Sequence, residues 1–341
     1  MKVFKGSYFE IGLQQGEIYK KNKINLTTII PNKSIIENQL KVYKKYYPEA
    51  LEELQGIAKG IGCPVDIIYH MLLANELIWF TKNYKYSEAC TIFGIKNKNG
   101  YFIGRNLDWI PVTKDVMEAY RREVKNRYKI IAVSDMLITG KKNIKNERLI
   151  YDAIDAINEK GLYVGITFAH GNSTQYGLSW KDFVKIISET CKGVDEALEL
   201  FKTIPLSVPK NFFIADKSGK MIVVEHNSNK YKVIYPKDGV LIKTNHFLDP
   251  ELSRIDNVLR RNPYHNTYKR YKAVLDHINK IKEKINSDKL FEILSDKKNQ
   301  ICQIGNMQTI WSLVLNMKKR EYLLVRRSDK SIEKLQKLSI S

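Results

Sequence analysis

The sequence predicts a layered α+β fold in which two antiparallel sheets carry helices on their outer faces. Strand pairs joined by tight turns are expected at residues 90–108 and 149–168, because short apolar runs flank a turn that contains Asn and Gly. A helix pair at 179–202 separates these strands from others at 211–235, and residues 309–326 are predicted to form a closing hairpin. Hairpins on both sides of a helical pair favour two sheets with helices outside.

The first strand pair turns at Asn99-Gly100 and carries the residues of most chemical interest. Asn-Gly readily supplies the positive φ angles that a tight hairpin turn requires. Cys90 stands at the start of the first strand, and Arg105 and Asp108 stand near the end of the second. Because a hairpin folds its second strand back beside its first, we expect the thiol, the guanidinium and the carboxylate to share one site.

These three groups suit a nucleophilic cysteine. A thiol attacks as its thiolate, and a permanent cation such as Arg105 favours that form. No histidine lies in the hairpin. If the peptide bond before Cys90 were cut, however, the new α-amino group would titrate near neutral pH and could take the thiol proton, with Asp108 orienting the ammonium group. The alternative is a buried structural cysteine beside a surface Arg/Asp pair.

Composition bounds the class of protein. The chain has 341 residues, of which 43% are hydrophobic, enough for one large or two modest globular domains. Its net charge of +20 suits a basic, non-enzymatic binding protein, which remains the rival class, but the lysines are spread along the whole chain. The four cysteines stand far apart with no C-x-x-C pair, so we predict no metal, no cofactor and no disulfide framework.

The N-terminal region, residues 1–89, is predicted to be helical and to cover another part of the fold. Segments 10–22, 34–40 and 49–59 show apolar residues near helical spacing, and a further helix is expected at 65–76. The start of the chain lacks the apolar run of a signal peptide, and no stretch approaches transmembrane length. We therefore expect a cytoplasmic location and no membrane span.

Two asparagines stand where an amide could meet a reacting group. Asn158 begins the turn between two predicted strands, and an ordinary turn residue would explain it. Asn245 ends a predicted strand that begins at Leu241, where its amide N–H could point toward the negative charge of a tetrahedral oxyanion. A strand-terminating Asx turn is the alternative for Asn245.

Two charged regions each allow two interpretations. Residues 110–128 are polar and charged, which fits either a loop or a short helix over the site. Arg270 lies on a helix predicted at 266–282, where it stands either near the site or on a solvated face.

The run Cys90-Thr91, followed by Gly104-Arg105-Asn106-Leu107-Asp108-Trp109, resembles the start of the mature catalytic chain in N-terminal nucleophile hydrolases of the choloylglycine hydrolase and isopenicillin N acyltransferase group. Residues 6–12 and 56–62 look like the pro-segment of the acyltransferase branch. The resemblance implies a four-layered αββα sandwich, with residues 1–89 as pro-segment and residues 90–341 as catalytic domain. It also implies self-cleavage between Ala89 and Cys90, after which the two pieces stay associated.

The resemblance also implies roles for individual residues. Cys90 would be the nucleophile with its own α-amine as base, and Arg105 and Asp108 would be catalytic. Asn158, in a motif shared by both families, would contact the substrate or help to hold the oxyanion, and Asn245 would be the oxyanion-hole residue. Four further residues would support the site or bind substrate: Thr91, Trp109, His246 and Arg270.

The expected function is hydrolysis of a linear, non-peptide amide through an acyl-thioester on Cys90. The alternative within the same class is an acyltransferase that moves an acyl group from a CoA thioester or an amide to an amine. The expected partner is a small acyl-amide substrate, with no specific nucleic acid, and a homo-oligomer is left open.

Overall fold

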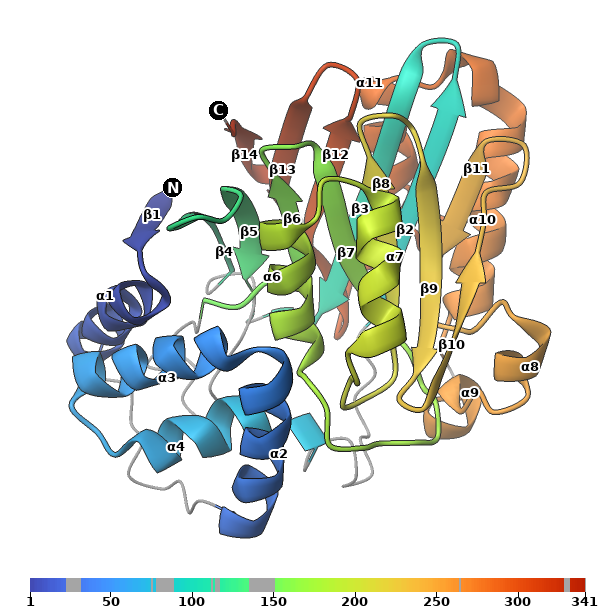
Figure 1. Ribbon diagram of the computed structural model, residues 1–341. Helices are drawn as coiled ribbons and strands as arrows, with labels where there is room; N and C mark the ends of the chain where they lie inside the picture. Colours follow the sequence, from blue (N-terminus) through green and yellow to red (C-terminus); the bar gives the residue numbers. More distant parts are fainter. Residues whose placement is uncertain are drawn as a thin grey trace.

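The structure is a computed structural model that describes residues 1–22, 32–74, 76–77, 89–111, 113, 117–134, 151–263, 265–327 and 332–340. Two sheets form its centre (Figure 1). In spatial order, the eight-stranded sheet holds β1 (Lys2–Gly6), β4 (Glu118–Val124), β5 (Ile130–Ser134), β6 (Asp155–Asn158), β7 (Leu162–Phe168), β8 (Lys210–Asp216), β9 (Met221–Asn227) and β10 (Lys230–Ile234). The six-stranded sheet holds β11 (Val240–Lys243), β2 (Ala89–Asn97), β3 (Gly100–Trp109), β12 (Gln308–Asn316), β13 (Glu321–Arg327) and β14 (Ile332–Leu338).

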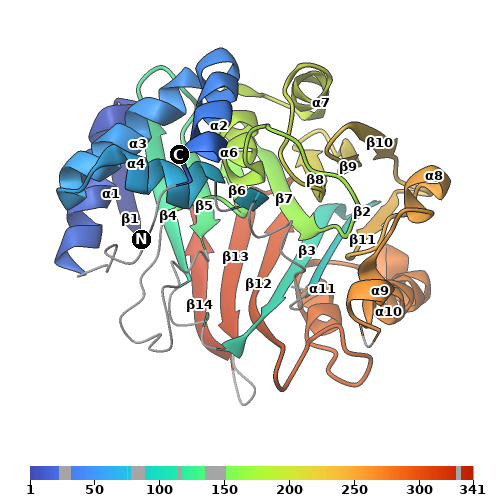
Figure 2. The same ribbon diagram turned by 90° about the horizontal axis from the view of Figure 1, so that it is seen from below.

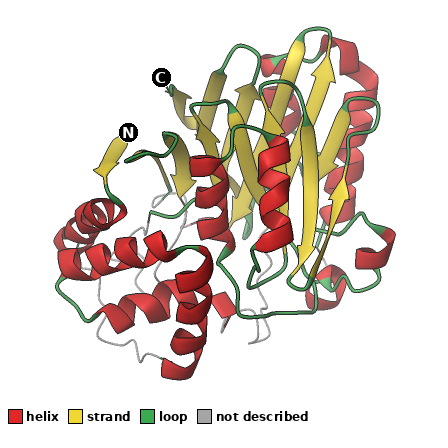
Figure 3. Ribbon diagram, in the orientation of Figure 1, coloured by secondary structure: helices red, strands yellow, loops and turns green. Residues whose placement is uncertain are grey.

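Helices cover the outer face of each sheet. In Figures 1 and 3, α6 (Trp180–Thr190) and α7 (Val194–Thr203) lie against the eight-stranded sheet, whereas α10 (Thr267–Ile281) and α11 (Ser287–Leu294) lie behind the six-stranded sheet. Figure 2 shows the two sheets as adjacent layers. Except for β1 with β4, the paired strands run antiparallel. The predicted four-layered αββα sandwich is confirmed.

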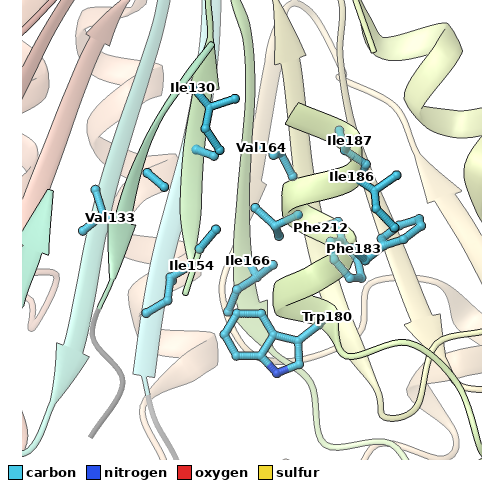
Figure 4. Close-up of a cluster of buried hydrophobic side chains, with 14 of the residues drawn as sticks. Ile130, Val133, Ile154, Val164, Ile166, Trp180, Phe183, Ile186, Ile187 and Phe212 are labelled. Atoms are coloured by element: carbon cyan, nitrogen blue, oxygen red, sulfur yellow. The ribbon is translucent and has the colours of Figure 1, made fainter. Parts of the chain in front are cut away.

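The sequence of α6 explains how it attaches to its sheet. Ser179 caps the helix by accepting from the Lys181 N–H. Trp180, Phe183 and Ile187 then recur at helical spacing and are buried. Figure 4 shows these side chains in one cluster with strand residues such as Phe212, whose ring centroid lies 5.6 Å from that of Phe183. On the far side, α10 and α11 bury their apolar faces against β2, β3 and β12 in a second cluster.

The N-terminal region is helical, as predicted, and lies beside α6 at one end of the sandwich (Figure 1). Its elements are α1 (Tyr8–Lys21), α2 (Lys33–Tyr46), α3 (Pro48–Ile61), α4 (Val65–Tyr69) and a π-helical turn (His70–Ala74). We did not predict that this region also contributes a strand. β1 pairs in parallel with β4. Residues 1–89, called the leader below, are therefore part of the eight-stranded sheet as well as a layer over it.

Glycines set the spacing of α1 and α3. A Cβ at Gly12 would lie 2.0 Å from the Glu53 carbonyl oxygen, and one at Gly56 would lie 2.2 Å from the Phe9 carbonyl oxygen. The two helices therefore pack backbone against backbone, and a larger residue at either glycine would push them apart. This contact accounts for glycines in the motifs at residues 6–12 and 56–62, and it fixes the position of Glu53.

Several predicted boundaries need correction. The loop or short helix predicted for residues 110–128 is wrong for Glu118–Val124, which form β4, while residues 112 and 114–116 lie outside the described residues. The strand expected to begin at residue 149 begins at Asp155, and residues 149–150 lie outside the described residues. We missed α11 and β14. No helix among the described residues has both the length and the apolar character needed to cross a membrane.

Candidate active site

The β2–β3 hairpin brings Cys90 and Arg105 to one face of the six-stranded sheet. Cys90 pairs with Leu107, and Ile92 pairs with Arg105. Side chains that pair directly share a face, and alternate residues on a strand return to it, so Cys90 and Arg105 point the same way. That face meets the other sheet, because the Arg105 Nη2 donates to the Ile166 carbonyl of β7 at 3.0 Å. Both side chains are buried, and the guanidinium interacts with the Cys90 side chain.

Asp108 lies on the opposite face, directly across from Ala89. Its Oδ1 accepts from the Thr309 hydroxyl at 2.6 Å, and its Oδ2 accepts from the Gln303 amide at 3.5 Å. Burial raises the pKa of Asp108, although the charge of Arg270 opposes the rise. We expected the thiol, the guanidinium and the carboxylate in one group. The structure instead pairs the Arg105 guanidinium with the Cys90 thiol. It places the Asp108 carboxylate beside Ala89, the residue before Cys90.

Asn245 and Arg270 hold the backbone of Cys90. The Asn245 Oδ1 accepts the Cys90 N–H at 2.9 Å and an Arg270 Nη2–H at 2.7 Å, while its Nδ2 donates to the Phe168 carbonyl at 3.2 Å. The Arg270 Nη1 donates to the Cys90 carbonyl and, at 2.8 Å, to the Thr91 hydroxyl. Arg270 is fully buried, so the structure places it beside Cys90 and not on a solvated face. Burial lowers the pKa of Arg270, against the opposing charge of Asp108.

Asn158 is not brought to Cys90. Its Nδ2 donates to the carbonyls of Ser188 and Cys191, at 2.9 and 2.8 Å, at the end of α6. Its Oδ1 accepts the N–H groups of Lys160 and Leu162, at 3.0 and 2.9 Å, inside its own turn. Its amide therefore ties the β6–β7 turn to the outer helix, and the substrate or oxyanion role that we expected for it stays a prediction. The simpler interpretation of Asn158 as a turn residue describes its place.

His246 and Trp109 make their described contacts with other residues than Cys90. The His246 Nδ1 lies 3.1 Å from the Thr244 hydroxyl and 2.9 Å from the Thr267 hydroxyl, and its ring stacks on Tyr268 with centroids 4.1 Å apart. Trp109 is half-buried at the end of β3, against the main hydrophobic core. Among the described residues, no group of three or more His, Cys, Asp or Glu could hold a metal ion.

Lowering the pH from about 7.5 to about 5 is expected to destabilise the fold through His246, by on the order of 2 kcal/mol. Burial, with the nearby cations Lys243 and Arg270, lowers the pKa of His246 to about 3. An unfolded histidine titrates near pH 6.5. Between these values the unfolded chain binds a proton that the folded protein does not, so stability falls as the pH falls. Urea unfolding of wild type and His246→Gln at both pH values should show a weaker pH dependence in the variant; equal dependence would contradict this.

Sequence reasoning missed two residues that shape the site. Thr267, at the start of α10, accepts the Asn245 backbone N–H at 2.9 Å through its hydroxyl. Asp155, at the start of β6, pairs with Arg105 at 3.3 Å. A signal for Asp155 existed, because an acidic residue in an otherwise apolar strand facing a sheet requires a partner. No such signal existed for Thr267, because its role depends on how α10 meets the end of β11.

The fold is that of the N-terminal nucleophile hydrolases. In fold the chain is similar to a variant of conjugated bile acid hydrolase from Clostridium perfringens, with a TM-score of 0.51 and 15% identity over 73% of this chain and 92% of that chain. Penicillin V acylase from Agrobacterium tumefaciens gives a TM-score of 0.49 at 15% identity, covering 70% of this chain and 82% of that one. The Caenorhabditis elegans ortholog of N-acylethanolamine-hydrolyzing acid amidase gives 0.47 at 14% identity, covering 67% and 93%.

Residues 95–330 match the family described as Acyl-coenzyme A:6-aminopenicillanic acid acyl-transferase. The chain belongs to this family. No curated protein matches the chain in sequence. The predicted membership of the acyltransferase family is confirmed, and the chain is an enzyme of that family.

Proposed function

We propose that the protein is an amidohydrolase that cleaves linear, non-peptide amides through an acyl-thioester on Cys90. The observation that carries this proposal is the set of contacts that Cys90 makes. Its side chain interacts with the Arg105 guanidinium, its N–H is held by Asn245, and its carbonyl is held by Arg270. A structural cysteine needs none of these contacts, whereas a nucleophile whose amine also acts must be fixed at both its side chain and its backbone.

Maturation in this proposal begins at the peptide bond between Ala89 and Cys90. The Cys90 sulfur attacks the Ala89 carbonyl, the C–N bond breaks, and the acyl group passes to sulfur while the Cys90 nitrogen gains a proton. Water then hydrolyses this thioester, which frees the thiol and leaves an α-amine on Cys90. Asp108 pairs directly with Ala89 on the neighbouring strand, where its carboxylate supports this step by orienting the amine that forms.

Turnover then uses the groups around Cys90. The α-amine takes the thiol proton, and Arg105 stabilises the thiolate. The thiolate attacks the substrate carbonyl and gives a tetrahedral oxyanion. Asn245 donates to that oxyanion, because its Nδ2 carries two hydrogens and only one is needed for Phe168. The ammonium group returns its proton to the leaving amine, and water hydrolyses the acyl-thioester.

Replacing Asn245 by alanine is expected to lower kcat by about 10²- to 10³-fold, because one donor to the oxyanion is lost. Steady-state kinetics on an acyl-amide substrate check this. Asn158→Ala is the matched control, since Asn158 bonds to its own turn and to α6. It should lower the melting temperature and leave kcat within a few-fold of wild type. A larger loss of kcat in Asn158→Ala than in Asn245→Ala would reverse these assignments.

Intact-mass analysis tests the proposal directly. The purified 39.7 kDa chain should resolve under denaturing conditions into two fragments that part before Cys90. An acid quench during turnover of an acyl-amide should then add the acyl mass to the fragment that begins with Cys90. Amide hydrolysis by a full-length chain that never carries an acyl group would contradict the mechanism.

Acyl transfer is the second candidate, and the acyl-transfer name of the matching family favours it. The first half of the mechanism is the same, and an amine replaces water in the second half. Incubation with acyl-amides or acyl-CoA donors, with and without an amine acceptor, separates the two functions by the product formed. Salt-sensitive DNA binding without amidase or acyltransferase activity would instead favour the basic binding protein.

A further inference from the structure

We propose that Asp155 and Tyr163, which belong to the opposite sheet from Cys90, are positioning residues that hold the Arg105 guanidinium against the thiol. This inference rests on the proposed role of Cys90 as nucleophile. It adds two residues of β6 and β7 to the machinery, neither of which stands in a motif of the hairpin.

The contacts form a chain from one sheet to the other. The Arg105 Nε donates to the Asp155 carboxylate, at 3.4 Å from Oδ1 and 3.3 Å from Oδ2. The Tyr163 hydroxyl donates to the Asp155 Oδ2 at 2.5 Å. All three side chains are at most 1% exposed, so water does not screen this ion pair. A buried carboxylate that accepts hydrogen bonds from a cation and a phenol is held in one orientation.

The rest of the guanidinium is also fixed. Its Nη1 donates to the Asn106 carbonyl at 2.5 Å, and the guanidinium carbon lies 5.1 Å from the centroid of the Trp311 ring. Gly165 leaves the room that this arrangement needs, because a Cβ there would lie 2.8 Å from the Asp155 Oδ2 and 2.3 Å from the Tyr163 hydroxyl. The carbonyls of Asn106 and Ile166 and the Trp311 ring therefore hold the Nη side of the guanidinium, and Asp155 holds its Nε side.

Two physical effects of Asp155 on the thiol have opposite signs. Its negative charge partly cancels the field of Arg105, so removing that charge without moving Arg105 would favour the thiolate and lower the pKa of Cys90. If Asp155 instead holds Arg105 in place, removing it lets the guanidinium leave the thiol, and the pKa of Cys90 rises. The direction of the change therefore separates a positioning residue from a charge that stands nearby.

The test is the pH dependence of Cys90 alkylation by iodoacetamide, followed on the Cys90 peptide by mass spectrometry so that the other three cysteines do not interfere. We expect Asp155→Asn to raise the pKa of Cys90 and to lower kcat/KM by about 10²-fold, chiefly in kcat. Asp155→Glu keeps the charge but displaces it, and should resemble Asp155→Asn. A lowered pKa in Asp155→Asn, or wild-type behaviour in Asp155→Glu, would overturn the proposal.

Tyr163→Phe keeps the inference testable if Asp155 variants do not fold, since it removes one hydroxyl. It should lower kcat by about tenfold with little change in KM. The matched control is Tyr43→Phe, because the Tyr43 hydroxyl on α2 also donates to a carboxylate, that of Asp182 on α6, at 2.7 Å. Equal kcat values for Tyr163→Phe and wild type would overturn the positioning role.

Alkylation also distinguishes this inference from the proposed function. A raised thiol pKa in Asp155→Asn, in a protein that turns over neither amides nor acyl donors, would support the positioning role and refute the function. Amidase activity with an unchanged thiol pKa in that variant would support the function and refute the positioning role.

Discussion

Replacing Cys90 by alanine is expected to leave the chain at full length and to abolish turnover of acyl-amides. Both steps need the same sulfur, first to attack the Ala89 carbonyl and then to attack the substrate. Asn245 and Arg270 keep their hydrogen bonds in this variant, because these bonds reach the backbone N–H and carbonyl of residue 90. Intact-mass analysis and an amidase assay on the same preparation measure the two losses together.

The matched control is Cys191→Ala. Cys191 is also a buried free cysteine, but it lies at the end of α6 and burial raises the pKa of its thiol to about 11. This variant should be cleaved and should turn over substrate at close to the wild-type rate. Cleavage or turnover in Cys90→Ala at rates near those of Cys191→Ala would remove the basis of the proposed function.

Replacing Glu53 by alanine is expected to cost about 3 kcal/mol in the free energy of unfolding. The two carboxylate oxygens of Glu53 each accept from Arg122 at 2.8 Å, and both side chains are buried between α3 and β4. Without Glu53 the buried guanidinium keeps its bond to Glu189, at 2.5 Å, and its position over the Tyr8 ring, 5.3 Å from the centroid. A buried charge that loses a partner pays its desolvation cost with less compensation. Urea unfolding measures the loss.

Glu49→Ala is the matched control on the same helix. Glu49 pairs with Arg127 at 2.8 Å, but both side chains are about one-third exposed. Exposed pairs of this kind contribute about 1 kcal/mol or less. In cleaved protein, Glu53→Ala should also weaken the hold of residues 1–89 on the catalytic domain, which gel filtration would show. Equal stability losses in the two variants would mean that the Glu53–Arg122 pair does not anchor the leader.

The hairpin could be predicted because its information is local. The tight turn predicted at Asn99-Gly100 lies one residue earlier, at Lys98-Asn99, and Gly100, with a φ of 146°, pairs with Asn97 as the first residue of β3. The register that follows fixes which residues stand opposite Cys90. The partners of Arg105 could not be predicted in the same way. They come from β6 and β7, and only the packing of one sheet on the other brings Asp155 to the guanidinium.

β4 shows why a charged stretch can hide a strand. Arg121 and Arg122 suggested a solvated loop, but Arg122 points inward and is neutralised by carboxylates of α3 and α6. Alternation of apolar and polar residues cannot reveal a strand in which a buried position holds a charged residue, when the ion-pair partners of that residue are far away in sequence. Asn158 combines both kinds of information: its contacts within the turn follow from local chemistry, whereas the role implied by its motif stays a prediction.

The parallel pairing of β1 with β4 affects how this protein can be produced. β1 occupies the outer edge of the eight-stranded sheet, so a polypeptide that starts at residue 90 would present the N–H and C=O groups of β4 to solvent. A bare edge of this kind is a template on which a second copy can add a strand. Material made without the first 89 residues would therefore tend to self-associate, and the two-chain form is better obtained by letting the intact polypeptide fold before it is cut.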